Sequence, residues 1–249
     1  MKRKADAGTE PEPGSRRKRR RLDVPHTFQK KGSAECGLAC VWMVEKYFGI
    51  DVSIPRLRRE IPVTERGTYA PQLGLHLLQS GLDVEIVTMN PWLFTTADVG
   101  IGPPEMRARI TQWRDRLSLR DEEGRLGAEY FIRFLDCGGT IRVQIPDEEY
   151  IRESLNAGSP LISLMTTCFL FGEVDFNLHF TVVVGYDPTE RALLVHDPWR
   201  DYGGGPHRSL RVAEFLYGLH ASSFHSADDG CLVRVSRPKK LKSGPRDSS

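Results

Sequence analysis

The sequence has few cysteines and no arrangement of them that would build a disulfide framework or a metal site. Its 249 residues contain five cysteines, an odd number at low density. We therefore expect free thiols in a reducing compartment. Cys36 and Cys40 are one helical turn apart, but no CxxC or HxxxH pattern accompanies them. Neither a metal ion nor another cofactor is expected.

Apolar segments that would enter a membrane are also missing. Residues 5–15, which follow the basic start, contain no apolar run that would make a signal segment. The longest mainly apolar stretch, Pro160–Phe171, is too short and too polar to span a bilayer. We expect no membrane association and a location in the cytoplasm or the nucleus.

The basic residues are concentrated at the N-terminus. Residues 1–21 hold nine basic and three acidic side chains, a net charge of +6, whereas the other 228 residues hold 26 basic and 30 acidic ones, a net charge of −4. Two basic clusters within residues 2–21 have the spacing of a bipartite nuclear-import signal, which would bind an import receptor; a solvated charged tail is the alternative. The remaining chain has no basic excess, so specific nucleic-acid binding is not expected.

Composition divides the chain into one domain with a tail at either end. Residues 1–23 are charged and lack an apolar period, which predicts a disordered basic tail. Residues 24–236 are expected to form the folded domain, since hydrophobic residues make up 39% of the chain. Residues 237–249 are basic and polar, and we expect them to be flexible.

The hydrophobic pattern predicts an α+β fold. Helices are expected at 36–48, 70–81, 104–118, 124–136, 147–157 and 212–219. Strands are expected at 83–88, 140–145, 161–166, 179–185, 192–197 and 230–235. Helices come first and strands mostly follow, which favours an antiparallel sheet over a doubly wound one. The helix at 36–48 is apolar on most sides, so we expect it in the core.

Cys36 is the first candidate for chemistry because it opens this core helix. The unpaired N–H groups and the positive dipole end of a first helical turn favour a thiolate over a thiol. Gly37 beside it would leave room for a substrate backbone. The alternative for a lone cysteine is a small buried hydrophobic residue.

His179 and Asp197 are the second and third candidates. His179 lies at the start of a very apolar strand and needs a polar partner there. Asp197 ends the next strand, and the connection Tyr186–Arg191 has the length and the turn residues of a hairpin. If the two strands pair, the carboxylate can orient the imidazole and stabilise its charged form. The alternatives are a hydrogen-bonded core histidine and an Asp-Pro pair that only begins a turn.

Together the three residues have the order and the chemistry of a Cys-His-Asp triad. The separation of 143 residues between Cys36 and His179 is similar to the papain spacing. A thiolate can attack a carbonyl, the histidine can deliver a proton and the acid can orient the histidine. The anionic intermediate needs hydrogen-bond donors, and the Gln29 side chain and the Cys36 backbone N–H are expected to form this oxyanion hole.

Two sequence blocks resemble a known family. They are Val24–Gln29 continued by Glu35–Cys40, and His179–Asp187 continued by His196–Pro198. Both resemble the C39-like cysteine peptidases, and more closely the guanylyl cyclase-domain-containing family, which is similar to that group. Asp228-Asp229 resembles the C-terminal acidic segment of the same family. The resemblance implies a papain-like fold over residues 24–236, with Gln29, Cys36, His179 and Asp197 at the active-centre positions.

These observations predict a cysteine-dependent hydrolase or acyltransferase that acts on an amide, peptide or thioester carbonyl. Two alternatives stay open. The family name suggests a guanylyl cyclase-like nucleotide enzyme, although Gly203–Gly205 lacks the Lys-Ser/Thr of a phosphate-binding P-loop. The other alternative is a non-catalytic binding module on the same fold.

Overall fold

The computed structural model describes residues 19–171, 177–222 and 228–238. Its helices are α1 Cys36–Tyr47, α2 Ile54–Glu60, α3 Ala70–Gln79, α4 Pro103–Arg116, α5 Glu122–Asp136, α6 Glu148–Asn156, α7 Cys168–Phe171 and α8 Val212–Ala221, with 3-10 turns at Thr96–Asp98 and Arg200–Tyr202. Its strands are β1 Arg20–Arg21, β2 Asp83–Thr88, β3 Thr140–Val143, β4 Leu161–Thr166, β5 Leu178–Asp187, β6 Ala192–His196, β7 Arg208–Arg211 and β8 Cys231–Ser236.

The strands of the described residues form one mainly antiparallel sheet. Their order is β3-β2-β8-β4-β5-β6-β7, and β1 pairs with β5 beside this path. The pair β2–β3 is parallel, and α4 and α5 lie in the crossover that a parallel pair requires. The other pairs are antiparallel. The predicted α+β class with an antiparallel sheet is therefore confirmed.

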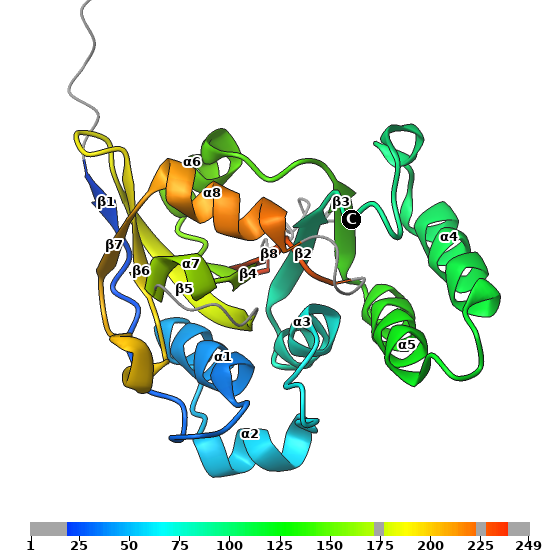
Figure 1. The fold of residues 1–249 in the computed structure, drawn as a ribbon, viewed down its shortest axis with the longest axis horizontal. Coiled ribbons are helices and arrows are strands. Elements are labelled where there is room, and N and C mark those ends of the chain that lie inside the picture. Colours follow the sequence, from blue (N-terminus) through cyan, green and yellow to red (C-terminus); the bar gives the residue numbers. More distant parts are fainter. Residues whose placement is uncertain (1–18, 172–176, 223–227, 239–249) are drawn as a thin grey trace, which may run out of the picture.

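Helices cover both faces of the centre of this sheet. Every residue of β4 and nearly every residue of β5 is buried, as expected for strands without a solvent face. Figure 1 shows α1 and α3 on one side of these strands and α6 and α8 on the other. Four short elements escaped the sequence prediction: α2, a charged helix capped by Ser53; β7, a mostly polar edge strand; the one-turn helix α7; and β1.

Helix α1 is buried over most of its length, as its apolar sequence predicted. Nine of its twelve residues are buried, and it packs against β5. Glu45 is the exception to its apolar character. The Glu45 carboxylate accepts hydrogen bonds through Oε1 from His76 of α3 and from Ser80 at the end of that helix, which reduces the cost of a polar group inside the domain. The helix that carries Cys36 is thus fixed to both the sheet and α3.

The folded body begins before the predicted boundary at residue 23. Arg20 and Arg21 pair with Tyr186 and Gly185 of β5, and Leu22 is only 3% exposed. The backbone N–H of Leu22 donates to the carbonyl of Val184 at 2.7 Å. The burial of Leu22 and the hydrogen bonds to β5 stabilise this segment by more than the charges of Arg20 and Arg21 destabilise it. Residues 19–23 therefore belong to the domain rather than to a disordered tail.

The outer parts of both predicted tails lie outside the described residues. Residues 1–18 contain most of the basic clusters, so the import signal stays a prediction. At the other end, the Arg237 side chain donates to the carbonyl of Phe48 at 2.9 Å, and residues 239–249 are not described. Within the described ranges, no helix is both long enough and apolar enough to cross a bilayer.

Replacement of Leu22 tests the corrected boundary. Leu22→Ala should lower the free energy of unfolding by about 2–3 kcal/mol, because it removes a buried leucine side chain. The control is Asp23→Ala, which changes the exposed neighbour and should have almost no effect. Urea unfolding of the full chain measures both. Equal stability of the two variants would contradict the corrected boundary, and residues 19–23 would then be assigned to the tail.

Candidate active site

Cys36 opens α1 with no side chain capping the helix in front of it. Glu35 occupies the N-cap position, but its carboxylate is bound by the Arg58 guanidinium, at 2.6 and 2.8 Å, and makes no cap hydrogen bond. The backbone N–H groups of Gly37 and Phe180 form hydrogen bonds with the Cys36 sulfur. The start of α1 and the adjoining strand β5 thus supply donors that favour a thiolate.

His179 and Asp197 are brought together by the β5–β6 hairpin. The strands pair antiparallel up to Val182 and His196; Asp197 directly follows His196, and His179 lies three residues before Val182 at the same end of the hairpin. His179 Nε2 lies 2.8 Å from Asp197 Oδ1, and both side chains are buried. The hairpin inferred from the sequence is confirmed, and so is the contact between the two side chains.

The Cys36 thiol completes the group, because it lies close enough to the His179 side chain for each of the two to shift the pKa of the other. Asp197 occupies Nε2 of the imidazole, which leaves Nδ1 as the ring nitrogen for the sulfur. The structure therefore brings together all three side chains that the sequence nominated. Their spatial order is thiol, imidazole and carboxylate.

The charges of this group stabilise one another against burial. Burial opposes ionisation of Cys36, but the hydrogen bond and the charge of His179 lower the pKa of the thiol below its ordinary value. Burial also disfavours a charged His179, yet its bonds to Asp197 and Cys36 raise the pKa of the imidazole to about 9. The pKa of Asp197 is lowered by His179 despite burial. Each of these shifts favours the charged form of its group, so the three side chains together favour a thiolate beside an imidazolium.

Asp197 is held by further donors that the sequence did not reveal. The backbone N–H of Trp199 donates to Asp197 Oδ1 at 2.9 Å, and Arg208 of β7 donates to Oδ2 at 3.4 Å. The Trp199 ring also lies against the His179 ring, with 5.0 Å between centroids. Trp199 could have been suspected from its place after Asp197-Pro198, but Arg208 lies on the edge strand that was not predicted.

The adjacent His196 has a structural role. Its Nε2 lies 2.8 Å from the carbonyl of Val24, and its Nδ1 accepts a hydrogen bond from the backbone N–H of His207 at 3.1 Å. Burial lowers the pKa of His196 to about 4, so it is neutral at physiological pH. His196 thus anchors the start of the domain to β6 and takes no part in the triad.

Gln29 lines the same pocket as Cys36, as its predicted role requires. Its backbone N–H donates to the carbonyl of Pro198 at 3.0 Å, and its side-chain Nε2 donates to the carbonyl of Ser33 at 2.6 Å. An amide nitrogen carries two hydrogens, so one N–H of Gln29 is not used by Ser33. Its part in an oxyanion hole stays a prediction.

The expectation for Gly37 was wrong. A Cβ atom at this position would lie 2.2 Å from Thr68 Oγ1 and 3.0 Å from Leu73 Cδ1. The missing side chain of Gly37 therefore makes room for Thr68 and for the packing of α3 against α1. It does not open a path for a substrate backbone.

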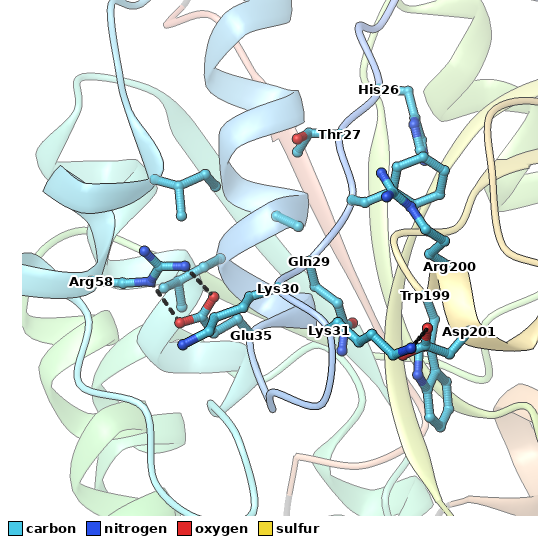
Figure 2. Close-up of a pocket in the computed structure, with 14 residues that line it drawn as sticks. His26, Thr27, Gln29, Lys30, Lys31, Glu35, Arg58, Trp199, Arg200 and Asp201 are labelled. Carbon is cyan, nitrogen blue, oxygen red and sulfur yellow. Dashed lines mark hydrogen bonds and ion pairs between the residues drawn. The ribbon is translucent and has the colours of Figure 1, made fainter.

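Two hollows meet at Gln29 and Trp199. The first is a pocket with a volume of about 570 Å³ that contains Cys36 and His179 in its wall. The second hollow, a groove of similar volume, runs past His26, Glu35, Arg58 and Arg200. Figure 2 shows this groove, with Gln29 between the start of α1 and the segment that carries Trp199. A substrate that reaches Cys36 can therefore extend to either side of Gln29.

Models of two related families match the sequence. The Peptidase C39 family matches residues 24–99, which include Gln29 and Cys36, and the Peptidase_C39 like family matches residues 110–217, which include His179 and Asp197. The matches support a C39-like cysteine peptidase with a papain-like fold, as the resemblance implied. They do not bear on the guanylyl cyclase-domain-containing family, which stays a prediction. No curated protein matches the sequence.

Three solved structures cover most of the chain at low identity. A double glycine motif protease from an AMS/PCAT transporter, in complex with the leader peptide, is 13% identical, with a TM-score of 0.44 over 88% of this chain and 94% of that one. The peptidase domain of Streptococcus ComA, a bi-functional ABC transporter, has the same identity and TM-score over 85% and 97%. Xylellain, a cysteine protease from Xylella fastidiosa, is 12% identical, with a TM-score of 0.45 over 89% and 86%.

Asp197→Asn should lower the pKa of His179 from about 9, because the carboxylate charge is lost while burial of the imidazole remains. The raised pKa adds stability that is fully present below the unfolded value of about 6.5 and is lost as the pH rises through about 9. In Asp197→Asn this loss should occur at lower pH. NMR titration of the histidine side chains measures the pKa, with His196 as the internal control. An unchanged His179 titration would show that Asp197 does not hold the imidazolium.

Proposed function

We propose that this protein is a cysteine hydrolase that cleaves a peptide or related amide bond through Cys36, His179 and Asp197. The observation that carries the proposal is the position of His179, whose Nε2 lies 2.8 Å from the Asp197 carboxylate and whose ring also lowers the pKa of the Cys36 thiol. A histidine with a purely structural role would need neither a neighbouring thiol of lowered pKa nor a place in the wall of an open pocket.

The chemistry follows from the favoured charge states. The Cys36 thiolate attacks the substrate carbonyl carbon and forms a tetrahedral oxyanion. The His179 imidazolium gives its proton to the leaving nitrogen as the C–N bond breaks, which leaves a thioester on Cys36. Neutral His179 then takes a proton from water, the hydroxide attacks the thioester, and the acid and the Cys36 thiol are released. Asp197 keeps the ring oriented through both steps.

The proposed oxyanion donors are the Cys36 backbone N–H and the remaining N–H of Gln29. The first lies at the uncapped start of α1, and the second belongs to a side chain in the pocket wall. The family models that match the sequence describe peptidases, which makes a peptide the natural substrate class to test here. If an amine replaces water, the same thioester would transfer its acyl group.

The two alternatives predict different behaviour. A guanylyl cyclase-like enzyme would act on a nucleotide with bound metal ions and would keep its activity after alkylation of Cys36. No observation on the described residues favours that reaction. A binding module would leave Cys36 intact in the presence of thiol reagents.

Selective alkylation tests the proposed nucleophile. Limiting iodoacetamide at neutral pH should label Cys36 faster than the exposed Cys137, although Cys36 is the more buried, because Cys36 is the one held as a thiolate by His179. Cys40 and Cys231 should stay unlabelled, because burial raises the pKa of both thiols. The labelling rate of each cysteine is measured by mass spectrometry.

Two variants complete this test. His179→Gln should slow the labelling of Cys36 about tenfold or more and leave Cys137 unchanged, which serves as the control within the same molecule. Cys36→Ser should keep the fold and lose hydrolysis of any peptide substrate. If Cys36 reacts no faster than Cys137, and His179→Gln changes nothing, the binding module becomes the better reading.

A further inference from the structure

The pocket that contains Cys36 and His179, which is the catalytic pocket of the proposed hydrolase, is also lined by acidic side chains. Asp228 and Asp229 are 3% and 1% exposed, and both line the pocket that contains Cys36 and His179. Glu65 and Glu123 lie in the same wall, whose basic side chains among the described residues are Arg66 and His179. A pocket with this excess of one charge concentrates the field of its carboxylates on whatever enters it.

The two aspartates are fixed in place by the domain core. Asp228 Oδ2 accepts a hydrogen bond from the backbone N–H of Ala70, the first residue of α3, at 2.8 Å. The carbonyl of Asp229 accepts one from Asn90 at 3.3 Å, and β8 begins two residues later. The carboxylates therefore belong to a rigid part of the pocket, where a binding group can be preorganised.

The charge of Asp228 acts inside the pocket. The pKa of Tyr69 is raised to about 12, first by burial and then by the negative charges of Asp228 and Glu123. Tyr69 lies in the pocket wall, so its phenol reports the potential there. Arg66 opposes this effect on Tyr69, and its exposed ion pair with Glu123, at 2.6 Å, offsets the charge of Glu123 rather than that of Asp228.

A buried hydroxyl beside the nucleophile also awaits a partner. Thr68 is 9% exposed and lines the pocket, and its Oγ1 lies against Gly37, next to Cys36. This oxygen has no hydrogen-bond partner within the described structure. Buried polar groups are rarely left unpaired, so a ligand group at this end of the pocket would satisfy it.

The acidity is confined to this side of Gln29 and Trp199. The groove on the other side is lined by four basic side chains, Lys30, Lys31, Arg58 and Arg200, and two acidic ones, Glu35 and Asp201. Figure 2 shows both acids in ion pairs, Glu35 with Arg58 and Asp201 with Lys31. The sign of the lining thus reverses where the two hollows meet.

We propose that the catalytic pocket binds a cationic group of the substrate, an ammonium or guanidinium, against Asp228 and Asp229. The Thr68 hydroxyl would bond to a polar substrate atom close to Cys36. This inference rests on the proposed function, since it describes the substrate that Cys36 would attack. A peptide with a basic side chain, or with its free α-amino group near the cleaved bond, has the required chemistry.

Charged thiol reagents measure the potential at Cys36 directly. The probes are 2-aminoethyl and 2-sulfonatoethyl methanethiosulfonate, whose thiosulfonate sulfur is attacked by the cysteine thiolate, with loss of methanesulfinate and formation of a mixed disulfide. The ratio of the cationic to the anionic rate at Cys36 should exceed the same ratio at Cys137 by about tenfold, because carboxylates attract one reagent and repel the other. Equal ratios would overturn the inference.

Single Asp-to-Asn variants assign this effect to the two aspartates. Asp228→Asn and Asp229→Asn remove the charge and keep an oxygen that can accept hydrogen bonds, so each should lower the ratio at Cys36 while thermal unfolding stays cooperative. The matched control is Asp83→Asn on β2, an exposed residue outside the pocket, which should leave the ratio unchanged. A ratio that neither Asp228→Asn nor Asp229→Asn changes would contradict the assignment.

Peptide protection then tests recognition. Alanine pentapeptides blocked at both ends, with a central Lys, Gln or Glu, compete with iodoacetamide for Cys36, together with a pentaalanine amide whose α-amino group is free. The Lys peptide should protect Cys36 at about tenfold lower concentration than the Gln peptide, and the Glu peptide should be weakest. Stronger protection by the free-amine peptide would assign the subsite to a substrate N-terminus. Equal protection by Lys and Glu peptides would overturn the inference.

The two proposals fail in different ways. Rapid, His179-dependent alkylation of Cys36 without any charge preference would leave the hydrolase intact and remove the cationic subsite. Loss of selective alkylation itself would remove the proposed function, and the subsite with it.

Discussion

The hydrogen bond between His179 and Asp197 is the interaction on which the candidate site depends. Each side chain is buried, and each would be costly to bury in its charged form alone. The bond exists because β5 and β6 pair as a hairpin, with the histidine near the start of one strand and the aspartate just after the end of the other. Donors from Trp199 and Arg208 then hold the Asp197 carboxylate in place, and the carboxylate in turn holds the His179 imidazole through Nε2.

The opposite pKa shifts of Cys36 and Cys40 follow from their positions in α1, which are one helical turn apart. Cys36 and Cys40 lie in the same helix, yet the pKa of Cys36 is lowered and that of Cys40 is raised well above its ordinary value. Burial opposes ionisation of both thiols, and only Cys36 has His179 and two backbone donors within reach to offset it. The Glu35–Arg58 pair contributes by occupying the carboxylate that would otherwise cap the helix start.

The sequence was enough to nominate the three residues because Cys36 and His179 lie on long apolar elements with clear periods and Asp197 directly follows another. The helix at Cys36, the strand at His179 and the strand ending at Asp197 are all found, and the short hairpin between the strands fixed their pairing. The sheet as a whole could be classed for the same reason. The parallel pairing of β2 with β3 could not be predicted in this way. The crossover between them runs through two surface helices, α4 and α5, whose packing is not revealed by any local sequence pattern.

Other features were missed because they depend on contacts distant in the sequence. Arg208 lies on a short polar edge strand, and Leu22 is buried only through pairing of a charged segment with β5. Gly37 suggested an open approach, but the space beside it is filled by Thr68, some thirty residues later in the chain. Asp228 and Asp229 were noticed as an acidic segment, and only the fold shows that they face the same pocket as Cys36.

The central claim is that Cys36 is a thiolate at neutral pH because His179 is an imidazolium beside it. The most direct measurement is the ultraviolet absorbance of the thiolate as a function of pH, taken as the difference between the wild-type protein and Cys36→Ser. We predict a thiolate signal that is already present at neutral pH and that moves to higher pH in His179→Gln. A signal that appears only above the ordinary thiol pKa of about 8.5, and is the same in both proteins, would contradict the account.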